Sequence, residues 1–293
     1  MDLRPVIDVP LVRRLVAAQF PQWASLEVRP VAFGGWDNRT FHLGDALVVR
    51  MPSAAGYAAS VDKEQRWLPV LAPRLPLAVP VPVGRGVPAF GYPFGWSVNP
   101  WIPGETAREA EIADRCAFAV DLADFLLALR AVDATGGPAA GAHSFYRGAP
   151  LTWYDDETRG ALGRHGDAVD ARIWDAALAA RWDGPPVWFH GDVADGNLIV
   201  REGRLSAVID FGTSGVGDPA CDVTIAWTSF SGAARAAFRG RLAVDDAMWA
   251  RARGWTLWKA LITLDDDDQA AAAWARRVRR EVRAEWLTGH EQP

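Results

Sequence analysis

The sequence VWFHGDVADGN at residues 187–197 and the sequence VIDFG at residues 208–212 decide how the rest of the chain is interpreted. Each begins with apolar residues, β-branched ones among them, that are typical of a buried strand. Asp192 lies in the polar loop after the first strand, Asn197 ends that loop, and Asp210 follows the second strand. The two stretches therefore predict a strand–loop–strand unit that gathers oxygen-bearing side chains.

These side chains suit one reaction, the transfer of a phosphoryl group from a nucleotide. Such a transfer needs a carboxylate that orients the acceptor hydroxyl and takes its proton, and oxygen ligands that hold Mg²⁺ on the triphosphate. Asp192 is placed to be that carboxylate, whereas Asn197 and Asp210 offer hard ligands that suit Mg²⁺ and not Zn²⁺. The pattern H-x-D-x-x-x-x-N followed by D-F-G is that of a kinase catalytic loop and metal loop.

Taken singly, these residues have ordinary structural interpretations. A lone aspartate in a polar loop usually caps a turn or a helix, and D-F-G alone carries almost no information. The joint occurrence of both motifs, in this order and in a strand–loop–strand context, favours the catalytic interpretation. We expect His190 to brace the loop and not to carry a proton, because Asp192 already supplies the base.

A third motif, GDPACD at residues 217–222, follows the second stretch. Together the motifs resemble those of the aminoglycoside phosphotransferase family, the antibiotic kinases and their relatives with a protein-kinase-like fold. The N-terminal strand meander, the connector ending in IPGE and the helical remainder also fit. The resemblance implies that Asp192 is the catalytic base and that Asn197 and Asp210 bind Mg²⁺, with ATP or GTP as the phosphate donor.

The resemblance also implies roles outside the catalytic loop. Asp218 and Asp222 would support the loops, and Asp218-Pro219 independently predicts a helix start with Asp as the cap. The connector would bind the nucleobase through the carbonyl of Pro100 and the N–H of Ile102. Pro100 has no N–H but keeps the carbonyl that this role needs. A proline-stiffened hinge is an alternative that the sequence leaves open.

The phosphate-binding cation is where the chain departs from the kinase pattern. Kinases of this fold pair a lysine on the third strand with a helix glutamate, but here the strand carries Arg50 and the helix Glu64. Arginine supplies the same charge with two donors and a different geometry. Lys63 is the alternative cation, although it adjoins Glu64 and would point away from it. A glycine-containing turn, with Gly35 and Asn38 as nucleotide contacts, is a weak signal for the phosphate-covering loop.

The predicted fold class is α+β, with a protein-kinase-like arrangement of two lobes. A nucleotide-binding lobe, built on an antiparallel sheet with a helix, is expected at residues 1–99, a hinge at 100–104, and a larger, mainly helical lobe for catalysis and substrate binding at 105–293. The expected elements are helices at 11–20, 61–72 and 106–132 (the last opened by a Thr106–Glu109 capping box), strands at 26–33, 41–43, 46–51, 80–83 and 94–98, and an exposed insertion at 136–150.

Composition excludes several classes of protein. The chain has 293 residues, 50% of them hydrophobic and 23% charged, and no apolar run approaches the length of a membrane span. Its formal charge of −5 argues against a nucleic-acid partner. Cys116 and Cys221 cannot form a disulfide framework, and the N-terminal residues lack a signal-peptide layout. We therefore expect a cytoplasmic protein without a membrane partner.

The acceptor is expected to be a small molecule. Gly191 replaces the arginine with which protein kinases clamp a phosphorylated loop, and no A-P-E motif follows the metal loop. The resemblance implies an antibiotic hydroxyl, yet such folds also phosphorylate sugars and amino alcohols. A metabolite kinase, a nucleotide-binding pseudokinase and a non-enzymatic interaction protein are the alternatives. Intact Asp192, Asn197 and Asp210 argue against the pseudokinase.

Acidic side chains would be needed to bind a polycationic aminoglycoside. The candidates are Asp155, Asp156 and Glu157, and the run of aspartates at residues 265–268. An acidic run is also typical of a solvated surface. If the neighbouring aromatic pair, Trp153 and Tyr154, faces the groove instead, a more apolar acceptor such as a macrolide fits.

Overall fold

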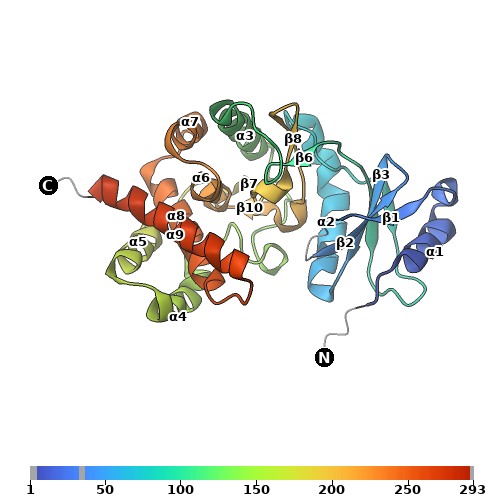
Figure 1. Cartoon of the computed structure of the whole chain (residues 1–293), viewed down its shortest axis with the longest axis horizontal. Coiled ribbons are helices and arrows are strands. Elements are labelled where there is room, and N and C mark those ends of the chain that lie inside the picture. The colour runs from blue at the N-terminus through green and yellow to red at the C-terminus, as the bar shows by residue number, and fades with distance from the viewer. Residues whose placement is uncertain (1–4, 33–36, 291–293) are drawn as a thin grey trace.

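The chain folds into a smaller sheet lobe and a larger helical lobe (Figure 1). The computed structural model describes residues 5–32 and 37–290. Among these residues, a five-stranded antiparallel sheet with the order β1-β2-β3-β5-β4 forms the smaller lobe. Its strands are β1 (Val28–Pro30), β2 (Asn38–Leu43), β3 (Leu47–Pro52), β4 (Gly84–Gly86) and β5 (Trp96–Pro100), and its helices are α1 (Val9–Gln19) and α2 (Ala55–Leu71).

Helix α1 shows how local sequence signals position an element of this lobe. The carboxylate of Asp8 accepts a hydrogen bond from the N–H of Leu11 at 2.9 Å, and Pro10 lies in the first turn. The helix buries Leu15 and Val16 in the same apolar cluster as the inward-facing residues of the sheet. The cap and the apolar face therefore agree with the helix that the sequence predicts here.

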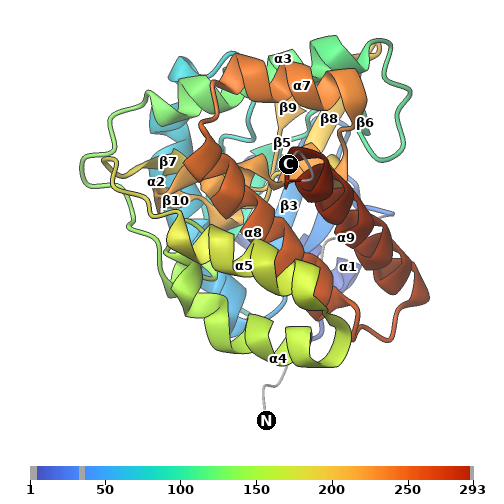
Figure 2. The same ribbon diagram turned by 90° about the vertical axis from the view of Figure 1, so that its left-hand side faces the viewer.

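The larger lobe consists mainly of helices. Its helices are α3 (Arg115–Arg130), α4 (Asp155–His165), α5 (Ala168–Ala179), α6 (Ile225–Thr228), α7 (Gly232–Leu242), α8 (Asp246–Thr263) and α9 (Gln269–His290). Its two small antiparallel sheets pair β7 (Val187–Phe189) with β10 (Gly215–Gly217), and β8 (Leu198–Arg201) with β6 (Glu105–Thr106) and β9 (Arg204–Val208). Helix α8 packs against both α5 and α9 (Figure 2). The predicted α+β class and two-lobe arrangement are confirmed.

The predicted start of the long helix at Thr106 is wrong. Thr106 lies in β6, where it pairs with Ile199, and this pairing holds its backbone extended. Helix α3 begins at Arg115 instead, and the carboxylate of Asp114 caps it by accepting from the N–H groups of residues 116 and 117. A sheet contact with a strand far along the chain overrides the local capping pattern.

The strand expected at residues 80–83 is displaced to Gly84–Gly86. Pro80 and Pro82 have no N–H to donate, so this segment cannot form a regular ladder with β5. Val83 is the first residue of this segment that donates to β5, and its N–H bonds to the carbonyl of Val98 at 2.8 Å.

The segment at residues 136–150 is not the exposed insertion that its prolines and glycines predict. Ser144 and Ala149 are buried, and the N–H of Ala140 bonds to the carbonyl of Val216 at 2.9 Å. At Gly148 the backbone has a φ of +77°, and a Cβ there would lie 2.1 Å from the ring of Phe189. The segment is therefore packed directly against strand β7, which leads into the loop of Asp192.

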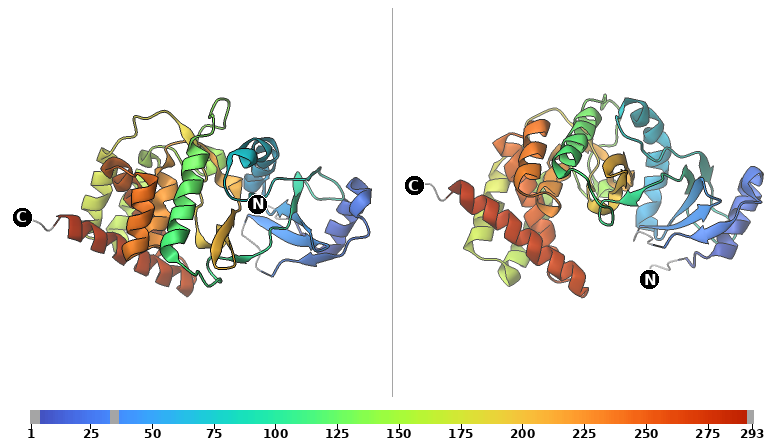
Figure 3. Two further views of the ribbon diagram at one scale, coloured as in Figure 1. Left: turned by 90° about the horizontal axis from the view of Figure 1, so that it is seen from above. Right: turned by 45° about the horizontal axis from the view of Figure 1, so that its top comes forward.

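Helix α2 belongs to both lobes. It lies between the sheet and the larger lobe (Figure 3). Leu68 and Leu71, near its C-terminal end, pack in the apolar core of the larger lobe, as does Val79 on the following segment. A separate apolar cluster fills the smaller lobe. The position of α2 is therefore tied to the helical lobe, and so are the side chains that α2 presents between the lobes.

The helices that the structure describes are too short or too polar for a bilayer. None of those within residues 5–32 and 37–290 has both the length and the hydropathy needed to cross a membrane. The cytoplasmic location stays a prediction.

Candidate active site

His190 braces the catalytic loop at the end of β7. Its ring is buried, Nδ1 accepts a hydrogen bond from the N–H of Asp192 at 3.2 Å, and Nε2 lies 3.0 Å from the carbonyl oxygen of Ile209. These partners assign the ring proton to Nε2, which donates to that carbonyl. His190 thus connects the loop of Asp192 to the strand that precedes Asp210.

The side chain of Asp222 also holds the loop of Asp192, through its backbone. Its side chain is fully buried and accepts hydrogen bonds from the N–H groups of His190 at 2.9 Å and Gly191 at 2.7 Å. Burial raises the pKa of Asp222, while the hydrogen bonds from the two backbone N–H groups oppose this effect. Gly191 has a φ of +85°, and a Cβ there would approach the carbonyl of Thr213 to 2.9 Å. This close approach and the positive φ explain the glycine at this position.

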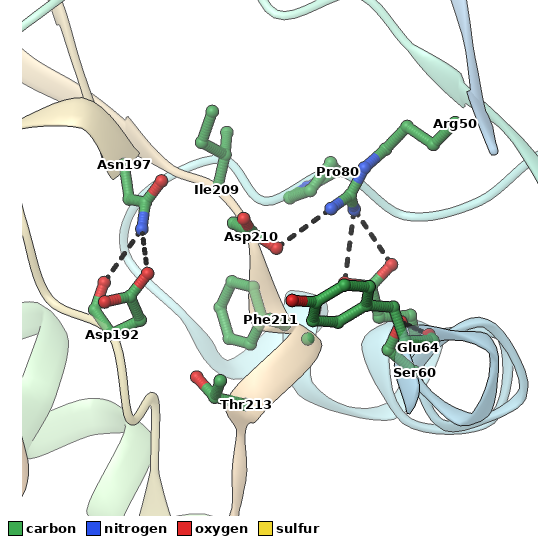
Figure 4. A network of polar contacts seen from close by, with 12 residues as sticks. Arg50, Ser60, Glu64, Pro80, Asp192, Asn197, Ile209, Asp210, Phe211 and Thr213 are labelled. Carbon is green, nitrogen blue, oxygen red and sulfur yellow. Dashed lines mark hydrogen bonds and ion pairs between the residues drawn. The ribbon is translucent and has the colours of Figure 1, made fainter. Parts of the chain in front are cut away.

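Asp192 and Asn197 face each other across the loop (Figure 4). The side-chain amide of Asn197 donates to Oδ2 of Asp192 at 2.8 Å and to its carbonyl oxygen at 2.9 Å. Asp192 is open to solvent, yet loss of hydration in its crowded surroundings and then the charge of Asp210 raise its pKa. The hydrogen bonds orient the carboxylate of Asp192 and leave the amide oxygen of Asn197 free for a cation.

Arg50 joins strand β3, helix α2 and the metal loop. One guanidinium nitrogen lies 2.9 Å from a carboxylate oxygen of Glu64, and another lies 2.9 Å from Oδ1 of Asp210 (Figure 4). Burial alone would lower the pKa of Arg50, but the charges of Glu64 and Asp210 raise it overall. The pairing of Arg50 with Glu64 that we expected is thus present in the structure, and Arg50 also contacts the expected metal ligand.

Of the two nucleotide contacts expected at the phosphate-covering turn, the structure describes one. Gly35 lies outside the described residues, and Asn38 is a buried residue of β2 opposite Pro52. Sequence reasoning missed Asp37, whose pKa is raised to about 6 by burial and by the charges of Asp210 and Asp192. Asp37 therefore lies within electrostatic range of both loop carboxylates, and the site gathers negative charge that a cation would neutralise.

The hinge keeps a free backbone donor. Pro100 ends β5, and the N–H of Trp101 bonds to the carbonyl of Ala46 at 2.8 Å. Within the described part of the chain, the N–H of Ile102 has no hydrogen-bond acceptor. The backbone groups of the hinge thus remain compatible with nucleobase binding.

Asp218 supports the loops through a partner that sequence reasoning missed. Its side chain pairs with Arg251 of α8 at 2.7 Å, and both side chains are only 6% exposed. Its carboxylate also accepts from the N–H of Ala220, which confirms the predicted cap. No local signal points to Arg251, because it lies on a helix distant in sequence from Asp218.

The acidic substrate candidates bind mainly to the chain itself. Asp155 and Glu157 lie in the first turn of α4 and accept the indole N–H groups of two tryptophans, at 2.7 Å each. Asp265 pairs with Arg164 at 2.6 Å. Asp156 is exposed. Asp155, Glu157 and Asp265 are therefore engaged in holding α4 against α5, α8 and the segment that follows α8.

The residues present fit a Mg²⁺ ion held jointly with nucleotide phosphates. Among the residues that the structure describes, none bonds to the amide oxygen of Asn197, and Asp210 uses only Oδ1 for Arg50. In the described residues, no cluster of three or more His, Cys, Asp or Glu side chains forms a complete metal site. Mg²⁺ ordinarily binds one or two protein ligands together with water and substrate phosphates, so two oxygen donors suit it.

A model of the phosphotransferase enzyme family matches residues 27–255. The chain belongs to this family. The predicted resemblance to the aminoglycoside phosphotransferases is thereby confirmed. The three loop motifs all lie inside the matched region. No match was found among curated protein sequences.

Solved structures share the fold of this phosphotransferase-family chain. The GDP complex of wild-type aminoglycoside 2'-phosphotransferase-IIIa has a TM-score of 0.72 at 17% identity, covering 95% of this chain and 99% of that chain. The apoenzyme of a macrolide 2'-phosphotransferase from Brachybacterium faecium has a TM-score of 0.62 at 22% identity, covering 94% of this chain and 97% of that chain. The likeness shows the protein-kinase-like fold.

Substitution of Arg50 by alanine should weaken nucleotide binding in the presence of Mg²⁺ by about 1.5–3 kcal/mol, because charge-assisted hydrogen bonds to phosphate are lost. Arg50→Lys should restore part of the affinity, since it returns the charge without the two-pronged geometry. Glu64→Ala should cause a smaller loss, because Glu64 only orients the cation. Isothermal titration of all variants at one salt concentration checks this, and equal affinity in all of them would exclude Arg50 from the phosphate site.

Proposed function

We propose that this protein transfers the γ-phosphate of a nucleoside triphosphate to a hydroxyl of a small molecule, such as an aminoglycoside-like or other antibiotic. The observation that carries the proposal is the joint placement of Asp192, Asn197 and Asp210 opposite the Arg50–Glu64 pair. One lobe thus offers a base and metal ligands, and the other offers a phosphate-binding cation. Phosphoryl transfer needs these parts together.

In this reaction the protein mainly positions groups. Asp192, held by the amide of Asn197 and by His190, would orient the acceptor hydroxyl and take its proton. Arg50 would bind the nucleotide phosphates, and the hinge carbonyl of Pro100 and N–H of Ile102 would bind the base of ATP or GTP. A Mg²⁺ ion on Asn197 and Asp210 would neutralise phosphate charge during transfer.

Among the antibiotic acceptors of the proposal, the cations and aromatic rings of the helical lobe favour a partly apolar compound over a polycation. Tyr154 and Trp258 pack at 4.1 Å, and the guanidinium of Arg147 lies 4.9 Å from the Trp258 ring. Loss of hydration raises the pKa of Asp192, the positive charge of Arg147 acts against this rise, and Lys259 also lies within electrostatic range of this base. An aminoglycoside would meet these cations, whereas a macrolide or another partly apolar hydroxyl compound would meet the aromatic rings.

Thermal-shift measurements test the proposal with a defined set of ligands. ATP and GTP, each with Mg²⁺, should raise Tm, since a ligand that binds only the folded state stabilises it. Hydroxylated antibiotics, sugars and amino alcohols are then added to the nucleotide complex, and hits are assayed for phosphorylated product. A metabolite kinase would turn over a sugar or an amino alcohol, and nucleotide binding without any turnover would favour the pseudokinase. A protein that no nucleotide stabilises would contradict the proposal.

Removal of the expected metal ligands should separate the stabilisation that Mg²⁺ adds from the stabilisation that the nucleotide provides by itself. Asp210→Ala should abolish the extra stabilisation that Mg²⁺ adds to a nucleotide, and Asn197→Ala should weaken it, because each variant loses an oxygen ligand. The measurement is the Tm gain from ATP or GTP with Mg²⁺ compared with EDTA. Unchanged Mg²⁺-dependent gains in both variants would place the metal site elsewhere.

A further inference from the structure

Lys63 makes an unusual set of contacts for a lysine on the helix next to the phosphate site. Its ammonium lies 2.6 Å from the carbonyl oxygen of Gly212, 2.8 Å from that of Ser214 and 3.0 Å from Nδ1 of His143. The residue is only 9% exposed. Three short contacts use all three ammonium protons, so the side chain has one well-defined orientation.

The contacts of Lys63 differ from those expected of a phosphate-binding cation. We expected Lys63 to point away from Glu64, and the hydrogen-bond acceptors of its ammonium are two carbonyls of the metal loop and the ring and carbonyl of His143. The His143 ring is oriented for this contact, because its Nε2 lies 2.8 Å from the carbonyl of Ala139 and donates to it, which leaves Nδ1 as an acceptor. The cation is therefore occupied by the protein itself.

Of the two carbonyls that Lys63 binds, that of Gly212 lies in the turn that follows Asp210 and that of Ser214 lies directly after this turn. This turn, Phe211–Thr213, is a single 3₁₀ turn, and Asp210 before it has a left-handed φ of 65°. Thr213 donates its hydroxyl to the carbonyl of His190 at 3.0 Å. A non-glycine residue keeps such a backbone conformation only when its surroundings hold it there. Lys63 and Thr213 supply that restraint from two sides.

Neighbouring residues of helix α2 thus control the two groups that meet the phosphates. Glu64 orients Arg50 of strand β3, and Lys63 holds the turn after Asp210. Arg50 and Asp210 in turn contact each other at 2.9 Å. A shift of α2 would therefore move the phosphate-binding cation and the metal ligand together.

We propose that Lys63 is a positioning residue for the metal site: its buried ammonium, bonded to the carbonyls of Gly212 and Ser214, holds Asp210 where it can bind Mg²⁺. The inference rests on the proposed function, in which Asp210 is a metal ligand. Without the ammonium, the two carbonyls lose their buried donor and the turn relaxes, so the carboxylate of Asp210 no longer keeps its place. The binding of the nucleobase at the hinge does not depend on Lys63.

The test uses Mn²⁺ as a paramagnetic stand-in for Mg²⁺, with the full chain and either ATP or GTP. Electron paramagnetic resonance measures the Mn²⁺ affinity of the nucleotide complex. Lys63→Met, which keeps length and removes the charge, should weaken this affinity by about tenfold or more, as loss of a group supporting a metal ligand generally does. Adenosine or guanosine, whichever base the wild type binds, should bind both proteins with an affinity equal within about twofold, because the hinge is distant from the substitution.

Two further variants separate positioning from general stability. Asp62→Asn is the matched control on the same helix, since Asp62 is exposed and its one ion pair within residues 5–32 and 37–290 is with exposed Arg85. It should leave Mn²⁺ affinity unchanged. Lys63→Arg keeps the charge with a different head group, and it should recover part of the Mn²⁺ affinity lost in Lys63→Met. If Lys63→Met does not fold, the Mn²⁺ affinity of Lys63→Arg tests the inference instead.

The outcomes distinguish this inference from the proposed function. A Lys63→Met protein with a lower Tm but wild-type Mn²⁺ affinity has lost only stability, and that result overturns the positioning role while leaving the proposed function intact. Equal loss of nucleoside and Mn²⁺ binding overturns it as well, since the damage then extends to the hinge. A wild-type protein that binds no Mn²⁺ with either nucleotide overturns both.

Discussion

Replacement of Asp192 by asparagine should lower kcat by about 10²- to 10⁴-fold, the usual contribution of a positioned general base. Asparagine has the same shape but cannot take the proton of the acceptor hydroxyl. The amide of Asn197 and the ring of His190 remain to hold the loop. The nucleotide affinity should therefore stay near that of the wild type.

The measurement is steady-state kinetics with an acceptor that the wild type uses well, combined with titration of the nucleotide with Mg²⁺. Asp195→Asn in the same loop is a suitable comparison, because Asp195 bonds to the hydroxyl of Ser229 and to none of the expected catalytic side chains. Near-normal turnover by Asp192→Asn would remove Asp192 from the role of base.

Replacement of Arg251 by methionine should destabilise the protein by about 3–5 kcal/mol, because it leaves the carboxylate of Asp218 buried without its partner. The pair is enclosed, with 6% exposure on each side, and Asp218 also caps the helix that carries Asp222. Urea unfolding in the absence of ligands measures the loss.

Two variants serve as controls for this loss. Arg204→Ala breaks an exposed ion pair with Asp121 and should change the free energy of unfolding little. The double variant Asp218→Asn/Arg251→Met should recover part of the stability, since the uncompensated charge is gone. If Arg251→Met is no less stable than Arg204→Ala, the buried pair does not support the loops.

The sequence predicts which side chains come together at the candidate site because these residues lie close together along the chain. Asp192 and Asn197 belong to one loop, and a β-rich segment on each side determines where that loop must lie. Arg50 and Glu64 are on a strand and the helix that follows it, so their pairing follows from neighbouring elements. The partners in these interactions lie in one loop or on adjacent elements, and apolar periodicity indicates where those elements are. A sequence displays both features directly.

The tertiary structure alone decided the contacts between distant segments. Lys63 meets Gly212 and Ser214, Asp218 meets Arg251, and the acidic residues of α4 meet tryptophans of α5 and α8. Such partners depend on how helices and loops pack, and no local pattern encodes the packing geometry. The same limit explains why helix α3 begins later than its capping pattern indicates. By itself the sequence determined the fold class, the order of the loops that carry Asp192 and Asp210, and the family. Packing decided which charged side chains remain available to a ligand, because a buried charge takes the nearest partner that compensates it.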